Sequence, residues 1–96
     1  MQRYSILTAD LSRCIVCSGR AECLHEVFFG TANRRKSIEW GLVVPLCNEC
    51  HNMSNRGVHF NKELDLKLKK MAESKWLEHY NKTIDDFIKE FGKNVL

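Results

Sequence analysis

Four cysteines form two closely spaced pairs that could bind a metal ion. Cys14 and Cys17 are the ends of one Cys-x-x-Cys motif, and Cys47 and Cys50 are the ends of a second. Two such motifs supply four thiolates, which is the number and type of donor that a tetrahedral structural Zn²⁺ site requires. A histidine, His51, follows the second motif directly. The spacing therefore predicts a structural zinc site made by the four cysteines.

The segment between the two motifs is longer than in a simple zinc ribbon and carries chemically active side chains. The pairs of a ribbon or finger are separated by roughly 12–20 residues, whereas Cys17 and Cys47 lie much further apart. Histidine and carboxylate side chains bind metals and transfer protons, and guanidinium groups bind phosphate. Side chains of these and other polar types occur in the segment: His25, Glu26, Asn33, Arg34, Arg35 and Lys36. We therefore expect the insert to form a functional site.

The length and the cysteine content limit the class of protein. The chain has 96 residues, enough for one domain with a limited core, which a structural metal commonly supplements. The cysteine count is odd, and no apolar signal segment opens the chain. No stretch approaches the length of a membrane span. We expect a reduced, cytoplasmic metalloprotein with no membrane partner, in which Cys23 is a free buried thiol near the zinc.

The overall charge does not identify a partner. The formal net charge is +3, and a Zn²⁺ ion with four thiolates would lower it to about +1. An argument for nucleic-acid binding therefore depends on local clusters of cations. The densest cluster is Arg34-Arg35-Lys36, which is either a solvated loop or a phosphate-binding one. Because arginine binds phosphate through paired hydrogen bonds, we expect these residues, together with Arg56, to contact a nucleic-acid backbone.

Local patterns predict two strands and short helices around the insert. Residues 21–29 contain β-prone apolar residues and predict a strand. Residues 37–40 predict one helical turn, and residues 42–46 predict an apolar strand that leads into the second cysteine pair. Pro45 places that strand at a sheet edge or at a strand end. A further helix is expected to begin near His51.

The C-terminal part of the sequence predicts two amphipathic helices. The first begins at Asn61, a good N-cap residue, and the second begins at Thr83, with Asp86 placed for a capping box. Trp76 lies on the apolar stripe of the first helix and is expected in the core, whereas His79 is expected at the surface.

The order of these elements resembles the HNH, or ββα-metal, endonucleases in their zinc-binding form. The stretches from His25 to Ser37 and from Gly41 to Cys47 are similar to a small phage-encoded branch of that superfamily. The resemblance covers about residues 14–60. It implies an α+β fold, a zinc-stapled treble clef with a ββα-metal motif, followed by two C-terminal helices in residues 61–96. Residues 1–96 would form a single domain.

The resemblance also implies a catalytic site. Members of the superfamily take a metal ligand and a general base from the first strand and another metal ligand from the helix. His25 and Glu26 occupy the strand positions, and His51 occupies the helix position. In one register His25 binds the metal and Glu26 is the base. In the other register His25 is the base, and Glu26 or His59 binds the metal. Asn55, one turn after His51, is a further candidate ligand.

The sequence departs from the family pattern at two positions. In the first register Glu26 stands at the position of the general-base histidine, and Leu42 stands at the position of a bracing asparagine. Asn33 is a candidate substitute for that asparagine. Neighbouring residues of a strand point to opposite faces, so His25 and Glu26 can share one site only at a strand end or a bulge.

The resemblance implies a metal-dependent DNA endonuclease that leaves 5′-phosphate and 3′-hydroxyl ends with low sequence specificity. It would use Mg²⁺ or Mn²⁺, separate from the structural Zn²⁺, on duplex or branched DNA. It would work in the cytoplasm of a bacterial host, as a homodimer or within a larger phage nucleic-acid complex. The alternative, which the departures at Glu26 and Leu42 favour, is a catalytically inactive treble-clef module that binds DNA or a protein partner.

Overall fold

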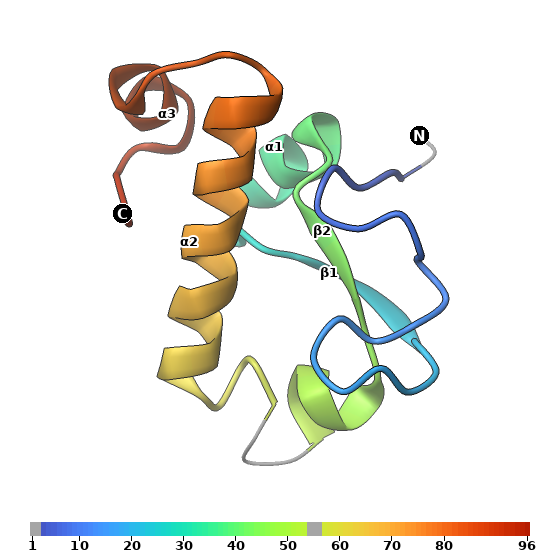
Figure 1. The fold of residues 1–96 in the computed structure, drawn as a ribbon. Helices are drawn as coiled ribbons and strands as arrows, with labels where there is room; N and C mark the ends of the chain where they lie inside the picture. The colour runs from blue at the N-terminus through green and yellow to red at the C-terminus, as the bar shows by residue number, and fades with distance from the viewer. Residues whose placement is uncertain (1–2, 54–56) are drawn as a thin grey trace.

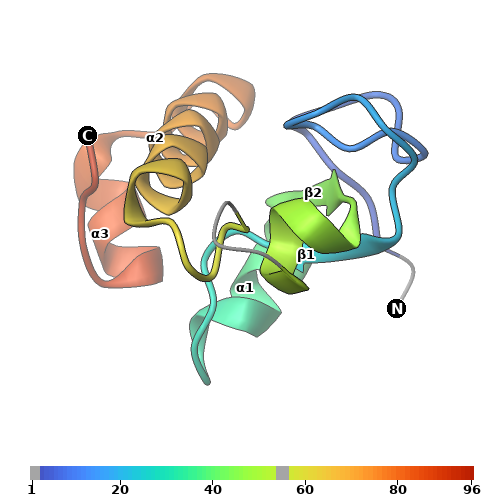
Figure 2. The ribbon, with the colours of Figure 1, turned by 90° about the horizontal axis from the view of Figure 1, so that it is seen from below.

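The chain folds into a small α+β structure in which helices flank a two-stranded sheet (Figure 1). The computed structural model describes residues 3–53 and 57–96. The elements in chain order are β1 (Cys23–Glu26), α1 (Asn33–Trp40), β2 (Val43–Leu46), the short π-helix η1 (Glu49–Met53), α2 (Lys62–His79) and α3 (Ile84–Phe91). In both ribbon views α2 and α3 lie on one side of the sheet and the N-terminal segment lies on the other (Figures 1 and 2).

The two strands are antiparallel, with His25 opposite Val44. All of β2 is buried, which explains its continuous apolar sequence. Pro45 is tolerated because each strand of a two-stranded sheet is an edge strand, as predicted. The predicted strand over residues 21–29 was too long. Only residues 23–26 pair with β2, and the chain bends away from the sheet directly after Glu26.

Helix α1 is longer than the single turn predicted from the sequence. It begins at Asn33, so the cationic run Arg34-Arg35-Lys36 lies on a helix. The prediction that this run lies in a loop was wrong. Gly41 ends the helix with φ 73°, a left-handed conformation that glycine adopts without steric strain. A Cβ atom at Gly41 would also lie 2.5 Å from the Tyr4 ring. The N-terminal segment therefore packs against the end of α1.

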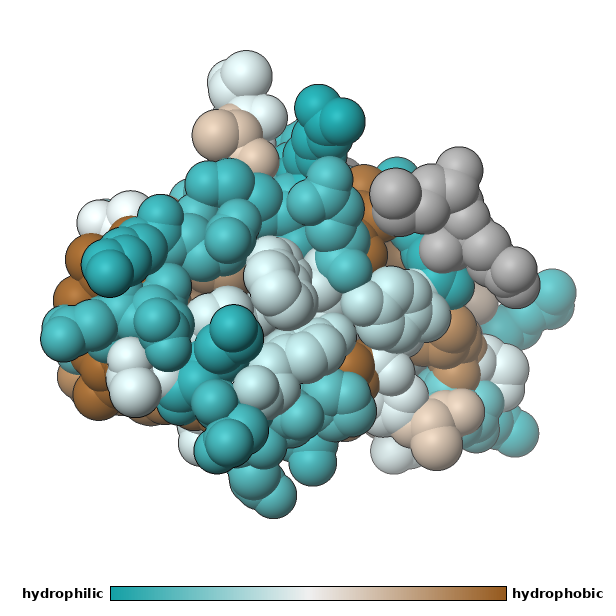
Figure 3. Space-filling view, turned by 90° about the horizontal axis from the view of Figure 1, so that it is seen from above, coloured by the Kyte–Doolittle hydropathy of each residue, from teal (hydrophilic) through white to brown (hydrophobic). Residues whose placement is uncertain are grey.

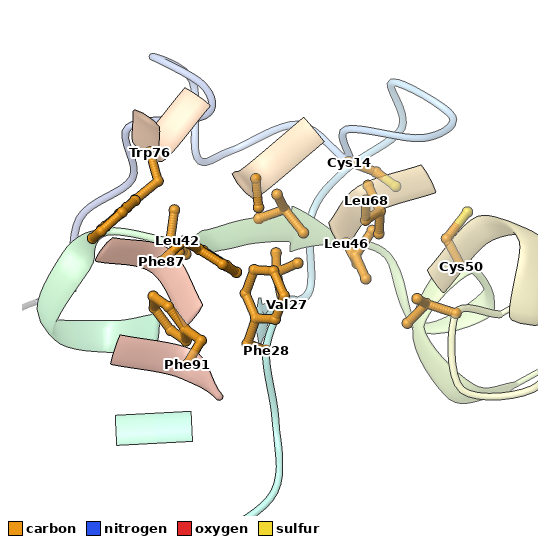
Figure 4. Close-up of a cluster of buried hydrophobic side chains, with 13 residues drawn as sticks. Cys14, Val27, Phe28, Leu42, Leu46, Cys50, Leu68, Trp76, Phe87 and Phe91 are labelled. Carbon is orange, nitrogen blue, oxygen red and sulfur yellow. The ribbon is translucent and has the colours of Figure 1, made fainter. Parts of the chain in front are cut away.

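The core lies between the sheet and the two C-terminal helices (Figure 4). Its largest side chains contact one another edge to face, with ring centroids 5.2 Å apart for Phe28 and Phe87 and 5.3 Å apart for Trp76 and Phe87. The buried position of Trp76, at 1% exposure, confirms the prediction. The core thus joins residues from the expected nuclease-like region to residues from the C-terminal extension.

The predicted N-terminal caps of the two C-terminal helices are confirmed. The Asn61 side chain accepts a hydrogen bond from the Leu64 N–H, and Thr83 forms a capping box with Asp86. The surface seen from the C-terminal end of α2 is mostly hydrophilic (Figure 3), and His79 is exposed as predicted. None of the helices in the described part of the chain has the length and apolar character that a membrane span needs.

Candidate metal centres

The four cysteines of the two Cys-x-x-Cys motifs come together at one end of the sheet. Cys14 and Cys17 lie in the N-terminal segment, Cys47 follows β2, and Cys50 lies in η1. Their four Sγ atoms lie within 4.8 Å of one another. The chain closes tightly around the first pair: the Cys14 N–H donates to the Gly19 carbonyl, and a Cβ at Gly19 would lie 3.4 Å from Cys17 Sγ.

The geometry of this cluster fits a zinc ion. Zn–S bonds of about 2.3 Å at tetrahedral angles place sulfur atoms about 3.8 Å apart, and Cys17 Sγ lies 3.7 Å from Cys47 Sγ. Burial raises the pKa of the Cys14 thiol, but backbone N–H groups at Cys17, Cys47 and Val16 outweigh it and lower that pKa to about 7. Thiolate is the form that binds zinc. The predicted Cys₄ set is therefore brought together and could hold Zn²⁺.

A second cluster consists of three histidines from three different segments. His25 lies in β1, His51 lies in η1, and His59 lies in the turn before α2. One nitrogen from each ring lies within 4.8 Å of the others. The Nε2 atoms of His51 and His59 are 3.0 Å apart, and the His25 ring centroid lies 5.2 Å and 5.1 Å from the other two rings.

The backbone around Gly57 places His59 over His51. The His59 N–H donates to the His51 carbonyl at 3.2 Å, and the Val58 N–H donates to the Cys50 carbonyl at 2.7 Å. A Cβ atom at Gly57 would lie 2.9 Å from the His51 carbonyl oxygen, so only glycine allows the chain to pass this close. The same η1 segment carries Cys50 and His51, so it links the cysteine cluster to the histidine cluster.

The surroundings of His25 and His51 favour neutral imidazole rings at these two positions. Burial is the main cause that lowers the pKa of His25 to about 3, and the neighbouring His51 and His59 add to it. Burial also lowers the pKa of His51, followed by the effect of His59. The buried His25 Nε2 has no hydrogen-bond partner among the described residues. Three imidazole nitrogens that lie close together, one of them without a partner, fit a bound divalent cation.

A carboxylate and a guanidinium complete the pocket around the histidines. The pocket has a volume of about 180 Å³, and its lining includes the three histidines, Leu24, Phe29, Glu26 and Arg34. Both His25 and Glu26 line the pocket. Strand β1 ends at Glu26, and a strand end is one of the two places where neighbouring residues were expected to share a site. Arg34 Nε lies 3.6 Å from Glu26 Oε1. The pocket thus combines metal-binding, proton-accepting and phosphate-binding groups.

Other predicted site residues point elsewhere. Arg35 is exposed and pairs with Glu39 on α1. The Lys36 ammonium donates to the Glu90 carbonyl, and the Asn33 amide donates to the Phe91 carbonyl at 3.1 Å, so both contact α3.

The predicted residues Asn55 and Arg56 lie outside the described residues. Cys23 is partly buried, and its thiol donates to the Leu46 carbonyl.

Ser37 stabilises the bend next to the pocket, although no sequence motif marks this residue. Its buried hydroxyl donates to the Phe28 carbonyl at 2.7 Å and accepts from the Phe28 N–H at 3.1 Å. These bonds stabilise the bend that directly follows β1, the strand that carries His25 and Glu26. Leu42, at the position of the expected asparagine, is fully buried in the core.

Comparison of the chain with protein-family models, with curated proteins and with solved structures gives no match.

Proposed function

We propose that the protein is a metal-dependent DNA endonuclease of the HNH type. One observation carries the proposal: three imidazoles, a carboxylate and a guanidinium line a single pocket next to a four-cysteine cluster. In this proposal β1, β2 and η1 form the ββα-metal motif, and Zn²⁺ on the cysteines completes a treble clef. The substrate is a phosphodiester of duplex or branched DNA, and the products carry a 5′-phosphate and a 3′-hydroxyl.

The histidine cluster would hold the catalytic cation. His25, His51 and His59 supply three imidazole nitrogens, and imidazole suits first-row transition metals better than Mg²⁺, which prefers oxygen ligands. Of the two cations expected from the sequence, this donor set favours Mn²⁺. When bound, the cation would supply Lewis-acid polarisation of the scissile phosphate and stabilise the negative charge on the leaving oxygen.

The remaining polar residues have separate tasks. Glu26 would accept a proton from the attacking water, and its side chain is 14% exposed in the pocket. Arg34, which is 62% exposed, is free to turn its guanidinium from Glu26 to a phosphate oxygen of the substrate. This assignment follows the first register, in which His25 is a ligand and Glu26 is the base. The convergence of all three histidines supports it.

The inactive binding module is the second candidate. The observation that favours it is the contact between Glu26 and Arg34, because an ion pair occupies both groups that the reaction needs. A nuclease assay on plasmid and branched DNA with Mg²⁺ or Mn²⁺ separates the two candidates. We expect cleavage that is lost in His51→Ala and kept in His79→Ala, since His79 is exposed on α2. Wild-type protein that binds DNA but cuts no substrate with either cation supports the inactive module.

The roles of His25 and Glu26 are separated by metal rescue. Loss of a ligand mainly weakens metal affinity, so excess Mn²⁺ should partly restore His25→Ala and His51→Ala. Loss of the base lowers the rate by about 10²–10⁴-fold at every metal concentration, so Glu26→Ala should not be rescued. The reverse pattern would assign the base to His25.

A further inference from the structure

Helix α2, which lies outside the region that resembles HNH nucleases, brings a lysine into contact with Phe29, one of the residues that line the histidine pocket. The Lys69 ammonium lies 4.5 Å from the centroid of the Phe29 ring. Phe29 lines the pocket, and its ring centroid lies 5.8 Å from that of His25 and 5.4 Å from that of His59. One aromatic ring therefore contacts both the lysine and the proposed metal ligands.

Lys69 is held in place and is not a freely moving surface lysine. Its ammonium donates to Asp65 Oδ2 at 2.8 Å, and the two side chains are only 17% and 22% exposed. The face of the Phe29 ring attracts the same ammonium. A lysine ammonium has three N–H donors, and Asp65 accepts one of them. The group is therefore oriented and still able to donate to a further acceptor.

An intrahelical ion pair alone does not account for this arrangement. A pair spaced by four residues stabilises a helix by about 0.3–0.5 kcal/mol and does so equally well on an exposed face. Lys69 instead loses much of its hydration beside an apolar ring. Its ammonium also lies over the ring of Phe29, which is one of the residues that line the pocket. A site for an anion in the pocket would make use of the positive charge of this ammonium.

We propose that Lys69 is a further phosphate-binding residue of the pocket, oriented by Asp65 and Phe29. It would bind a phosphate of the DNA strand next to the scissile bond, while Arg34 binds from helix α1. This inference rests on the proposed function, because it takes nucleic acid as the occupant of the pocket. It gives α2 a role in substrate binding in addition to its role in the core.

The test compares Lys69→Met with Lys70→Met in the zinc-loaded protein. Methionine keeps an unbranched side chain over Phe29, and Lys70 is an exposed lysine on the same helix, so both variants lose one positive charge. Binding of a fluorescent DNA duplex is measured by anisotropy from about 0.05 to 0.2 M NaCl without added divalent metal. We expect Lys69→Met to reduce the slope of log affinity against log salt by about 1, and Lys70→Met to leave it nearly unchanged. Lys69→Arg should keep the wild-type slope.

The cleavage assay gives a second and independent readout. A phosphate beside the scissile bond is held equally before and during the reaction, so Lys69→Met should raise KM by about 10-fold with little change in kcat. Equal salt slopes for Lys69→Met and Lys70→Met would overturn the role of Lys69 and leave the proposed function standing. Wild-type protein without salt-dependent DNA binding would overturn both. If Lys69→Met is unfolded by circular dichroism, Lys69→Gln takes its place with the same expected slopes.

Discussion

The bend after β1 depends on one hydroxyl group, and its removal should have a large effect. Ser37 is fully buried in α1 and satisfies both the N–H and the carbonyl of Phe28. In Ser37→Ala both backbone groups lose this partner. Because Phe28 is itself only 3% exposed, water cannot easily replace the hydroxyl.

The magnitude follows from these two bonds. A buried polar group left without a partner destabilises a protein by about 1–3 kcal/mol, so two such groups predict a loss of about 2–6 kcal/mol. In a domain of this size each kcal/mol lowers Tm by about 4–8 °C. We therefore expect Ser37→Ala to melt at least about 8 °C below wild type. The cavity left by one oxygen atom is small and adds little to this value.

Thermal and urea unfolding of the zinc-loaded protein measure the effect, with Ser74→Ala as the matched control. Ser74 is exposed on α2, so its substitution should change stability by less than about 0.5 kcal/mol. Ser37→Ala should also bind Mn²⁺ more weakly, because the bend that displays His25 is released. A loss below about 1 kcal/mol would refute the argument, since it would mean that the Phe28 backbone finds other partners.

Three further changes test other parts of the molecule. Cys47→Ser removes one thiolate, and because zinc binding is coupled to folding, the N-terminal half should unfold; unchanged zinc content and melting would contradict this. Burial raises the pKa of Glu73 despite its bond from the Val95 N–H. The folded state therefore binds that proton more tightly, and wild-type stability falls as pH rises above the ordinary glutamate value. Glu73→Gln should be more stable than wild type at pH 7, with the difference vanishing below about pH 4 in urea titrations. Thr83→Ala removes the N-cap of α3 and should destabilise the protein by about 1 kcal/mol in the same assay, whereas a change at exposed Lys82 should not.

Features with a strong local signal were predictable from the sequence. The two Cys-x-x-Cys motifs identified the cluster that the structure brings together, and the caps at Asn61 and Thr83 located the ends of the C-terminal helices. The placement of His25 beside His51 was expected only from the resemblance to HNH nucleases. The cysteine motifs and the caps depend on residue types at short, fixed spacing, which is the information that a single sequence contains.

Features that depend on tertiary contact were not predictable in the same way. His59 was one of several candidate metal ligands in the sequence. The close approach of the backbone at Gly57 brings the His59 ring to His51, with 3.0 Å between their Nε2 atoms. Ser37 resembles any serine in a short helix until the fold places it under Phe28. Lys69 is one of several lysines on α2, and its contacts with Phe29 and Asp65 distinguish it from the exposed ones.

The polar run at residues 33–36 shows how one error in secondary structure changes a functional interpretation. In a loop all four side chains would be available to a phosphate, but on a helix each residue turns by about 100° from the one before. Asn33 and Lys36, one turn apart, share a face and donate to the carbonyls of Phe91 and Glu90 at the end of α3. Those terminal carbonyls have no partners within their own helix. Lys36, which was expected to bind DNA, and Asn33, which was expected to replace a bracing asparagine, thus anchor α1 to α3. The same rotation leaves Arg34 as the residue of this run that lines the pocket.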